Sequence, residues 1–237
     1  MKLLYQLLFI LLFISFFSIS SKADKRNYVW TYQYQTLNRG LWELEYYNTS
    51  SSPLLRQMKG NTTSEHQIEL EVGMTDRFDI GLYQVFTQEP GASLKYEEFK
   101  IRARYRLFEK NEFFVDPLIY LEYIGVADFS KSEIEAKLIL SKSFGKFNFT
   151  LNPIAEFEFT NATKFTPAFS FGASYAFSEL FSLGFEAKGQ SSGYYIGPTL
   201  SHGNDNMWIA LSPLFAVGNV ETGKPEILIR IITGFGK

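Results

Sequence analysis

Cysteine is absent from this chain of 237 residues, and histidine occurs only at His66 and His202. Without cysteine, disulfide bonds and a lipid anchor on cysteine are excluded, which is unusual for a small secreted domain that needs cross-links. Neither charge is in excess, because 23 Lys and Arg residues are matched by 25 Asp and Glu residues. A net charge near zero gives no general electrostatic reason to bind nucleic acid. We therefore expect no nucleic-acid partner.

Long apolar runs are also rare. The only one covers residues 3–19, and no later segment is apolar enough for a membrane helix. The run follows a basic start and precedes small residues at Ser21 and Ala23, an order typical of a secretory signal peptide cleaved before Asp24. An uncleaved membrane anchor is disfavoured, because polar residues interrupt the run and a cleavage-like site ends it. We predict a cleaved signal peptide over residues 1–23.

The rest of the chain alternates between apolar and polar residues. Between residues 99 and 107, one side of the alternation holds Phe99, Ile101, Ala103, Tyr105 and Leu107, and the other holds Lys100, Arg102, Arg104 and Arg106. A helix, with its period of 3.6, would mix these two sets, whereas a strand separates them. The same separation recurs around residues 67–74, 133–141, 147–159 and 181–188.

Two architectures produce this alternation. A soluble sandwich turns its apolar side inward, and a membrane barrel turns it to lipid. The alternating segments run for about 9 to 12 residues, which suits a tilted strand crossing a bilayer, whereas sandwich strands are usually nearer five or six. We predict an all-β fold, a transmembrane antiparallel up-and-down β-barrel.

Polar turns separate the segments at regular spacing. Short turns at 75–77, 109–112, 145–146, 178–179 and 203–206 alternate with looser connections at 48–64, 87–93, 127–132, 160–163, 189–193 and 218–225. Outer-membrane barrels have short periplasmic turns and longer extracellular loops. We predict about twelve strands, at 40–50, 64–74, 78–88, 94–107, 113–125, 131–142, 147–160, 165–176, 181–189, 193–202, 207–217 and 226–236. An even number places both ends of the barrel on the periplasmic side.

Residues 40–237 thus form the predicted barrel, and residues 24–39 an N-terminal periplasmic lead-in. Within the lead-in, residues 28–35 also alternate. Three placements are open for them: an extra strand, a segment paired at the rim, or a piece inside the barrel. We favour the rim, because one more transmembrane strand would invert every later turn.

Four prolines lie inside predicted strands, on the apolar side: Pro117, Pro153, Pro198 and Pro213. Proline removes a ladder hydrogen bond, which is costly in lipid. Their similar distance from the periplasmic turns suggests a belt where the strands bulge or bend. The alternative is a soluble fold whose shorter strands end at these prolines.

The polar side of each strand would face the lumen. One strand carries a basic ladder of Lys100, Arg102, Arg104 and Arg106. The acidic lumen partners that we expect are Glu69, Glu71, Asp79, Asp116, Glu122, Glu133 and Glu135. One interpretation is a charged constriction that selects a solute, and the other is a salt-bridge lattice that fills the barrel. A barrel of twelve strands lies between the filled barrels of eight strands and the open channels of sixteen, so both interpretations remain possible.

Two motifs carry a resemblance to a known family. Residues 36–45 (TLNRGLWELE) are similar to an opening T-L-P-K-G-x-W-E-x-E stretch, with Asn38 where proline is usual. Residues 73–82 (GMTDRFDIGL) resemble a G-x-T-D-R periplasmic turn. Both are found in bacterial outer-membrane barrels that include transporters associated with meta-pathway phenol degradation. The carboxyl end departs from the pattern, because Phe235 is followed by two residues where such barrels finish on an aromatic one. The resemblance implies an outer-membrane barrel.

Catalytic residues are hard to find in this pattern. The strand map separates His66 from His202, which argues against a shared metal site, and Ser64 near His66 lacks a convincing partner for catalysis. We expect no enzyme activity, cofactor or metal.

We predict a monomeric, porin-like channel or transporter of the outer membrane for an unidentified small solute. Its partners would be the outer-membrane lipid and the assembly machinery. The alternative is a structural or adhesive barrel that acts through extracellular loops such as 48–64, with Arg56 and Lys59. A lipid-modifying enzyme is a third possibility.

Overall fold

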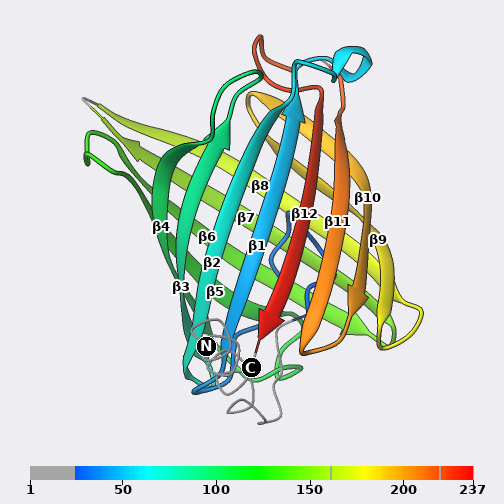
Figure 1. Cartoon of the computed structure of the whole chain (residues 1–237). Coiled ribbons are helices and arrows are strands. Elements are labelled where there is room, and N and C mark those ends of the chain that lie inside the picture. The colour runs from blue at the N-terminus through cyan, green and yellow to red at the C-terminus, as the bar shows by residue number, and fades with distance from the viewer. Residues whose placement is uncertain (1–24, 161, 219, 237) are drawn as a thin grey trace, which may run out of the picture.

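The structure, a computed structural model, describes residues 25–160, 162–218 and 220–236. The predicted signal peptide over residues 1–23 lies outside the described residues. In the described part, antiparallel strands form one closed barrel, in which each strand pairs with the next and β12 pairs with β1 (Figure 1). The strands are β1 (Trp42–Ser52), β2 (Thr63–Thr75), β3 (Phe78–Gln88), β4 (Lys95–Arg106), β5 (Asp116–Val126), β6 (Ser132–Phe144), β7 (Phe147–Phe159), β8 (Thr163–Ala176), β9 (Phe181–Gln190), β10 (Gly193–Gly203), β11 (Met207–Ala216) and β12 (Ile227–Gly236).

This arrangement confirms the predicted twelve-stranded barrel, and every strand boundary agrees with its prediction to within three residues. The largest difference is at β5, which begins at Asp116 instead of residue 113. The Asp116 carboxylate accepts a hydrogen bond of 2.6 Å from the backbone N–H of Asn111, a residue with a φ of 68°. This contact closes a longer turn before the strand and shortens β5.

The two rims of the barrel differ in their connections. β1 begins and β12 ends at the rim drawn at the bottom of Figure 1, which we call the lower rim. The upper rim carries the longest loops, including the connection after β1 with its short 3₁₀ helix Leu55–Gln57. The predicted alternation of short and long connections is imperfect: 107–115 is long at the lower rim, and β9 and β10 are joined at the upper rim by residues 191–192 alone.

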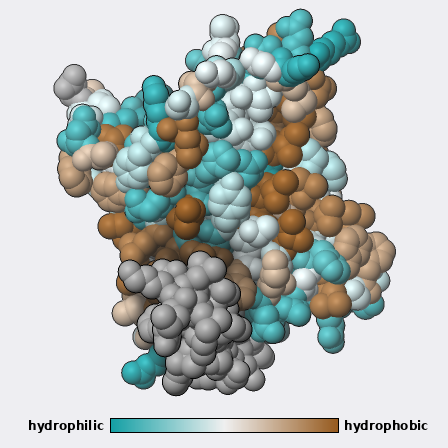
Figure 2. All heavy atoms as spheres, in the orientation of Figure 1, coloured by the Kyte–Doolittle hydropathy of each residue, from teal (hydrophilic) through white to brown (hydrophobic). Residues whose placement is uncertain are grey.

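Side chains alternate between the lumen and the outer surface. Along β1, Glu43, Glu45 and Tyr47 are buried, whereas Leu44 and Tyr46 are exposed on the outside. On the face that Figure 2 shows, apolar residues gather on parts of the outer wall, and hydrophilic residues predominate at the upper rim. Among the described residues, no helix is long and apolar enough to cross a membrane.

The four prolines lie within strands, Pro117 as the second residue of β5, and the ladder between β10 and β11 adapts to two of them. Between β10 and β11 the pairing skips from Ile196 with Phe215 to Leu200 with Leu211, the stretch that contains Pro198 and Pro213. Proline has no N–H to donate, so the two prolines are accommodated where cross-strand pairing is interrupted. The soluble alternative required strands that end at the prolines, and the strands do not end there.

The N-terminal segment, residues 25–41, lies inside the barrel as far as Leu37 and reaches the lower rim at residues 38–40, which are exposed. We call this segment the plug. It contains no strand. At its start Lys25 Nζ donates to the backbone oxygen of Glu179, in the turn between β8 and β9 at the lower rim (2.7 Å). The chain then rises inside the barrel, where Trp30 and Tyr32 line a cavity. It returns to the lower rim and enters β1 there (Figure 1). This placement differs from the rim position that the sequence favours for residues 28–35, and it corresponds to the third placement, a segment inside the barrel.

Candidate functional site: a plugged lumen with an open vestibule

Two arginines of the basic ladder lie in a compact ionic lattice in the lower half of the lumen. Arg102 Nη2 is 2.9 Å from Glu69 Oε1 and 2.5 Å from Glu71 Oε2. Arg104 pairs with Glu71 and donates to Asp79, with Nη2 2.8 Å from Oδ2. These residues are almost completely buried. Gly81 leaves the space for this lattice, since a Cβ there would collide with the Glu69 carboxylate.

The other two members of the ladder have different surroundings. Lys100 Nζ lies higher, 3.4 Å from Glu98 Oε1 and 3.9 Å from Glu122 Oε1. Arg106 lies near the lower rim, where it donates to the backbone oxygen of Asp76, and its guanidinium carbon is 5.8 Å from the centre of the Tyr34 ring. The four residues face the lumen but do not form one functional group.

The remaining acidic residues of the expected set lie outside this lattice. Asp116 pairs with Lys142, at 3.7 Å from its Nζ, and not with a residue of the ladder. Glu135 is 2.7 Å from Lys137 Nζ. Within the described chain, Glu133 has no cation within 4.0 Å. The structure therefore gathers Glu69, Glu71 and Asp79 in the lattice, and Glu122, Glu133 and Glu135 higher in the lumen, where Glu122 pairs with Lys100 of the ladder. Asp116 lies apart from both groups.

Glu186 of β9 binds the top of the plug. Its carboxylate accepts backbone hydrogen bonds from Val29 (3.0 Å), Trp30 (2.8 Å) and Thr31 (2.8 Å). Hydrogen bonds to a charged group are shorter and stronger than those between neutral groups. A single buried side chain thus satisfies three backbone donors that have no strand partner.

The descending arm of the plug is also bound by side chains. The Asn152 amide accepts from the Tyr32 backbone N–H (2.8 Å) and donates to the Tyr32 backbone oxygen (3.0 Å). Nearer the lower rim, the Asp79 carboxylate accepts from the Leu37 backbone N–H (3.0 Å). Asp79 therefore connects the plug to the ionic lattice.

Tyr28 fits a space that the barrel wall provides. Its hydroxyl donates to the backbone oxygen of Asn148 (2.8 Å) and accepts from Ser174 (3.1 Å). Burial raises the pKa of Tyr28, which keeps the hydroxyl neutral. A Cβ on Gly172 would lie 2.7 Å from the Tyr28 ring, so only glycine leaves room for the ring at that wall position.

The plug also adds a charge to the lumen. Arg26 Nη1 donates to the Tyr47 hydroxyl (2.9 Å) and is 3.4 Å from Glu45 Oε2. Tyr47 in turn donates to Glu69 (2.8 Å), which pairs with Arg102. A cation of the plug thereby enters a region where the carboxylates outnumber the arginines of the wall.

Apolar contacts complete the closure of the lower half. Val29 and Trp30 join a buried cluster that contains Tyr47, Tyr83, Tyr195, Trp208, Ala210, Leu214 and Ile232. On the opposite side, Tyr34 packs with Leu118, Tyr120 and Ile139. Lumen-facing apolar residues are unusual in a water-filled channel, and here the plug covers them.

Sequence reasoning missed the residues that hold the plug. Glu186 and Asn152 have the inward phase expected of lumen residues, but nothing marks them as ligands of backbone groups more than 100 positions earlier. The alternation over residues 28–35 was the one available indication that this segment is ordered.

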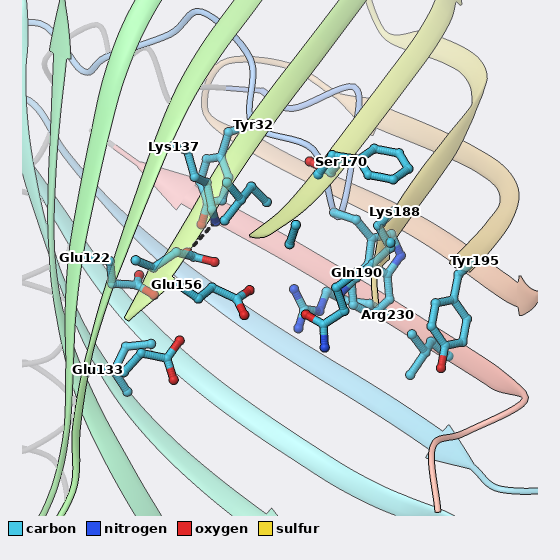
Figure 3. Close-up of a pocket in the computed structure, with 18 of the residues that line it drawn as sticks. Tyr32, Glu122, Glu133, Lys137, Glu156, Ser170, Lys188, Gln190, Tyr195 and Arg230 are labelled. Carbon is cyan, nitrogen blue, oxygen red and sulfur yellow. Dashed lines mark ion pairs between the residues drawn. The ribbon is translucent and has the colours of Figure 1, made fainter. Parts of the chain in front are cut away.

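Above the plug, a cavity of about 390 Å³ opens toward the upper rim, and we call it the vestibule. Trp30 and Tyr32 contribute to its floor, and strands on both sides contribute charged and polar walls (Figure 3). The labelled side chains in Figure 3 show carboxylates of β5, β6 and β7 on one side and Lys188 with Arg230 on the other.

The acidic wall follows from the register of the strands. Glu122 of β5 is opposite Glu135 of β6, which is opposite Glu156 of β7. On the basic wall, the Arg230 guanidinium carbon and Lys188 Nζ lie 4.1 and 4.7 Å from the centre of the Trp30 ring. The vestibule therefore has two walls of opposite charge.

The histidines lie away from this site. His66 is in the outward phase of β2, where its Nδ1 is 2.7 Å from the Tyr46 hydroxyl, and His202 is at the lower end of β10. Within the described ranges, no group of three or more His, Cys, Asp or Glu residues could hold a metal ion. Ser64 makes no hydrogen bond with His66, whose side-chain partners are Tyr46 and Asn48.

Comparison with known proteins gives structural matches alone. The sequence matches no model of a known protein family and no curated protein. The structure is similar to an outer membrane channel from Pseudomonas putida F1, with a TM-score of 0.62 and 11% identity over 89% of this chain and 100% of that one. It is also similar to the KdgM porin in complex with disordered oligogalacturonate (TM-score 0.58, 12% identity, 81% and 98% covered) and to the NanC porin (0.55, 8%, 82% and 98%). The chain therefore has the fold of outer-membrane β-barrel channels.

Proposed function

We propose that the chain is a porin-like channel of the bacterial outer membrane for small polar solutes, and that it is not an enzyme. The exposed apolar residues of the outer wall would contact lipid, after insertion by the outer-membrane assembly machinery. The lower rim would be periplasmic, because both ends of a barrel with an even number of strands lie there. Each chain encloses its own lumen, which supports a monomer.

The vestibule carries this proposal. A cavity inside a closed barrel, open at one rim and lined by opposed charges, is suited to capture a small polar solute. The lower half is closed by a plug that no strand ladder holds in place. Side-chain hydrogen bonds and packing bind it, and these contacts can be exchanged for water without opening the barrel wall. We infer a closed state whose opening requires movement of the plug.

The structural neighbours support the same class of function. The similar structures include an outer membrane channel and two porins, one of them in complex with an oligogalacturonate. Because their identity to this chain is low, they support a channel and no particular solute.

A second candidate is a structural or adhesive barrel. The filled lower half favours it, since Arg102 and Arg104 are neutralised by buried carboxylates and set no free positive potential. The loop after β1, with exposed Arg56 and Lys59, would then be the working surface.

Planar-bilayer currents distinguish the two candidates. We expect a small current from the full mature chain and a clearly larger one from a chain lacking residues 25–35. Glu186→Gln, which keeps the whole sequence but weakens the plug, should give an intermediate current. The mobility of unboiled samples on gels would establish that each barrel has folded. Folded barrels that pass no current in all three forms would contradict the channel and favour the structural barrel.

A further inference from the structure

We propose that the vestibule binds a small organic zwitterion, with its ammonium group toward Glu133 and Glu156 and its carboxylate toward Lys188 and Arg230. This inference rests on the proposed channel function and names the class of solute. It follows from the two charged walls, from the charges that stay uncompensated on them, and from the size of the cavity between them.

The acidic wall is arranged at a cost to the fold. Glu122, Glu135 and Glu156 are directly opposite one another on three neighbouring strands, and like charges in this relation destabilise a sheet. Lys100 and Lys137 compensate the first two of these carboxylates. Glu156 and the nearby Glu133 line the vestibule with no cation within 4.0 Å in the described chain. An ammonium group there would relieve their repulsion.

The basic wall offers the complementary site. Lys188 and Arg230 both lie over the ring of Trp30, at 4.7 and 4.1 Å from its centre. Arg230 also contacts Glu65, at 3.7 Å, and Thr49, at 2.7 Å. For Lys188, no carboxylate of the described residues lies within 4.0 Å. Two neighbouring cations with so little compensation favour a carboxylate between them and the solvent.

The arrangement favours one solute with both charges over other ligands. A metal ion needs several convergent ligands, and no cluster of three such residues occurs in the described part of the chain. A solute with a single charge would leave one wall uncompensated. The cavity of about 390 Å³ is at the small end of the range for ligand pockets, which suits a molecule of several heavy atoms.

Quenching of Trp30 fluorescence tests the proposal on the full mature chain in detergent. The probes are 4-aminobutyrate, which carries both charges, and its singly charged analogues butyrate and butylamine. We expect 4-aminobutyrate to bind about tenfold more tightly than either analogue, because each lost charged contact is worth about that factor. Trp30→Phe should remove the signal, which separates it from that of Trp42 and Trp208.

Variants assign the two ends of the probe. Glu133→Gln with Glu156→Gln should weaken the binding of 4-aminobutyrate about tenfold and leave the binding of butyrate unchanged. Lys188→Gln should also weaken the binding of 4-aminobutyrate, but leave that of butylamine unchanged. The matched control is Glu158→Gln, on the same strand as Glu156 but outside the cavity lining, where the carboxylate pairs with Lys131 at 3.1 Å.

Equal affinity for 4-aminobutyrate and one of its analogues, or no binding of 4-aminobutyrate, would overturn the inference. The same holds if the control weakens binding as much as the double variant. Because the binding assay needs no current, a conducting barrel that ignores the zwitterion would reject this inference alone. Binding by a barrel that never conducts would instead reject the channel.

Discussion

Glu186 shows how one side chain can organise a segment that has no secondary structure. Three consecutive peptide N–H groups converge on its carboxylate at 2.8 to 3.0 Å. Buried backbone donors must find partners, and residues 29–31 have no neighbouring strand to supply them. A buried carboxylate is itself stabilised by such donors, so the plug and Glu186 depend on each other.

Glu186→Gln should therefore loosen the top of the plug without unfolding the barrel. The amide has one acceptor oxygen, and its NH₂ group would face donors. Losing even one charge-assisted hydrogen bond costs about 1.5 to 3 kcal/mol, so amide-exchange protection at Val29, Trp30 and Thr31 should fall by about tenfold or more. Glu97→Gln, at an exposed position of β4, is the control. Unchanged protection in Glu186→Gln would mean that other contacts hold the segment.

The two faces of β6 give a second test at the scale of single residues. Leu138 lies midway along the strand and is 41% exposed on the outer wall, whereas the neighbouring Lys137 faces the vestibule. Leu138→Arg should destabilise the barrel by roughly 2 to 4 kcal/mol in lipid, and Lys137→Leu by less, because Glu135 stays within reach of water. Urea unfolding in lipid vesicles measures both. Greater damage from Lys137→Leu would reverse the assignment of inside and outside.

At the scale of elements, the direction of each side chain could be predicted from sequence, but its partner only in part: Asp79 and Glu122 pair with the ladder as expected, and Asp116 does not. Alternation determines which residues face the lumen, and the basic ladder of β4 faces the lumen. The pairing of side chains depends on strand register. Arg106 of β4 is opposite Leu118 of β5. Asp116 lies two residues before Leu118 and is opposite Ser141 of β6. Asp116 therefore lies beside Lys142 and not beside the ladder.

The lattice between β2, β3 and β4 should be structural. Replacing Arg102 and Arg104 together by Gln would leave Glu69, Glu71 and Asp79 buried without their cations, and breaking a buried ion pair costs about 3 to 5 kcal/mol. We expect the double variant to lose its heat-modifiable folded form on gels at a much lower temperature than the parent. Lys95→Gln, at the exposed end of the same strand, should not. A double variant as stable as the parent would argue that the lattice adds nothing to stability.

The plug marks the limit of what alternation reveals. Residues 28–35 alternate in sequence as a strand does, yet Tyr28, Val29, Trp30 and Thr31 are all buried and the segment forms no strand. A strand also needs a neighbouring edge, and in a closed barrel every edge is already paired. The segment consequently binds side chains such as Glu186 and Asn152, and these are contributed by strands far away in the sequence.

The whole molecule is asymmetric along the barrel axis. Its upper half holds a charged vestibule, and its lower half is filled by the plug, the ionic lattice and inward apolar side chains. Twelve strands enclose more space than the side chains of an eight-stranded barrel fill, and a folded-in N-terminal segment occupies the remainder of the lower half. We therefore propose that the lumen is closed at the periplasmic side and accessible from outside.

Thiol accessibility tests that claim directly, because a chain without cysteine gives no background. Gln190→Cys places a thiol in the vestibule, and Ser182→Cys places one in the lower lumen, where the serine is 1% exposed and bonded to Asn27 of the plug. With a membrane-impermeant maleimide added outside intact cells, we expect rapid labelling of Gln190→Cys. We expect labelling of Ser182→Cys only after residues 25–35 are removed. Equally rapid labelling of Ser182→Cys in the full chain would contradict a closed lower half.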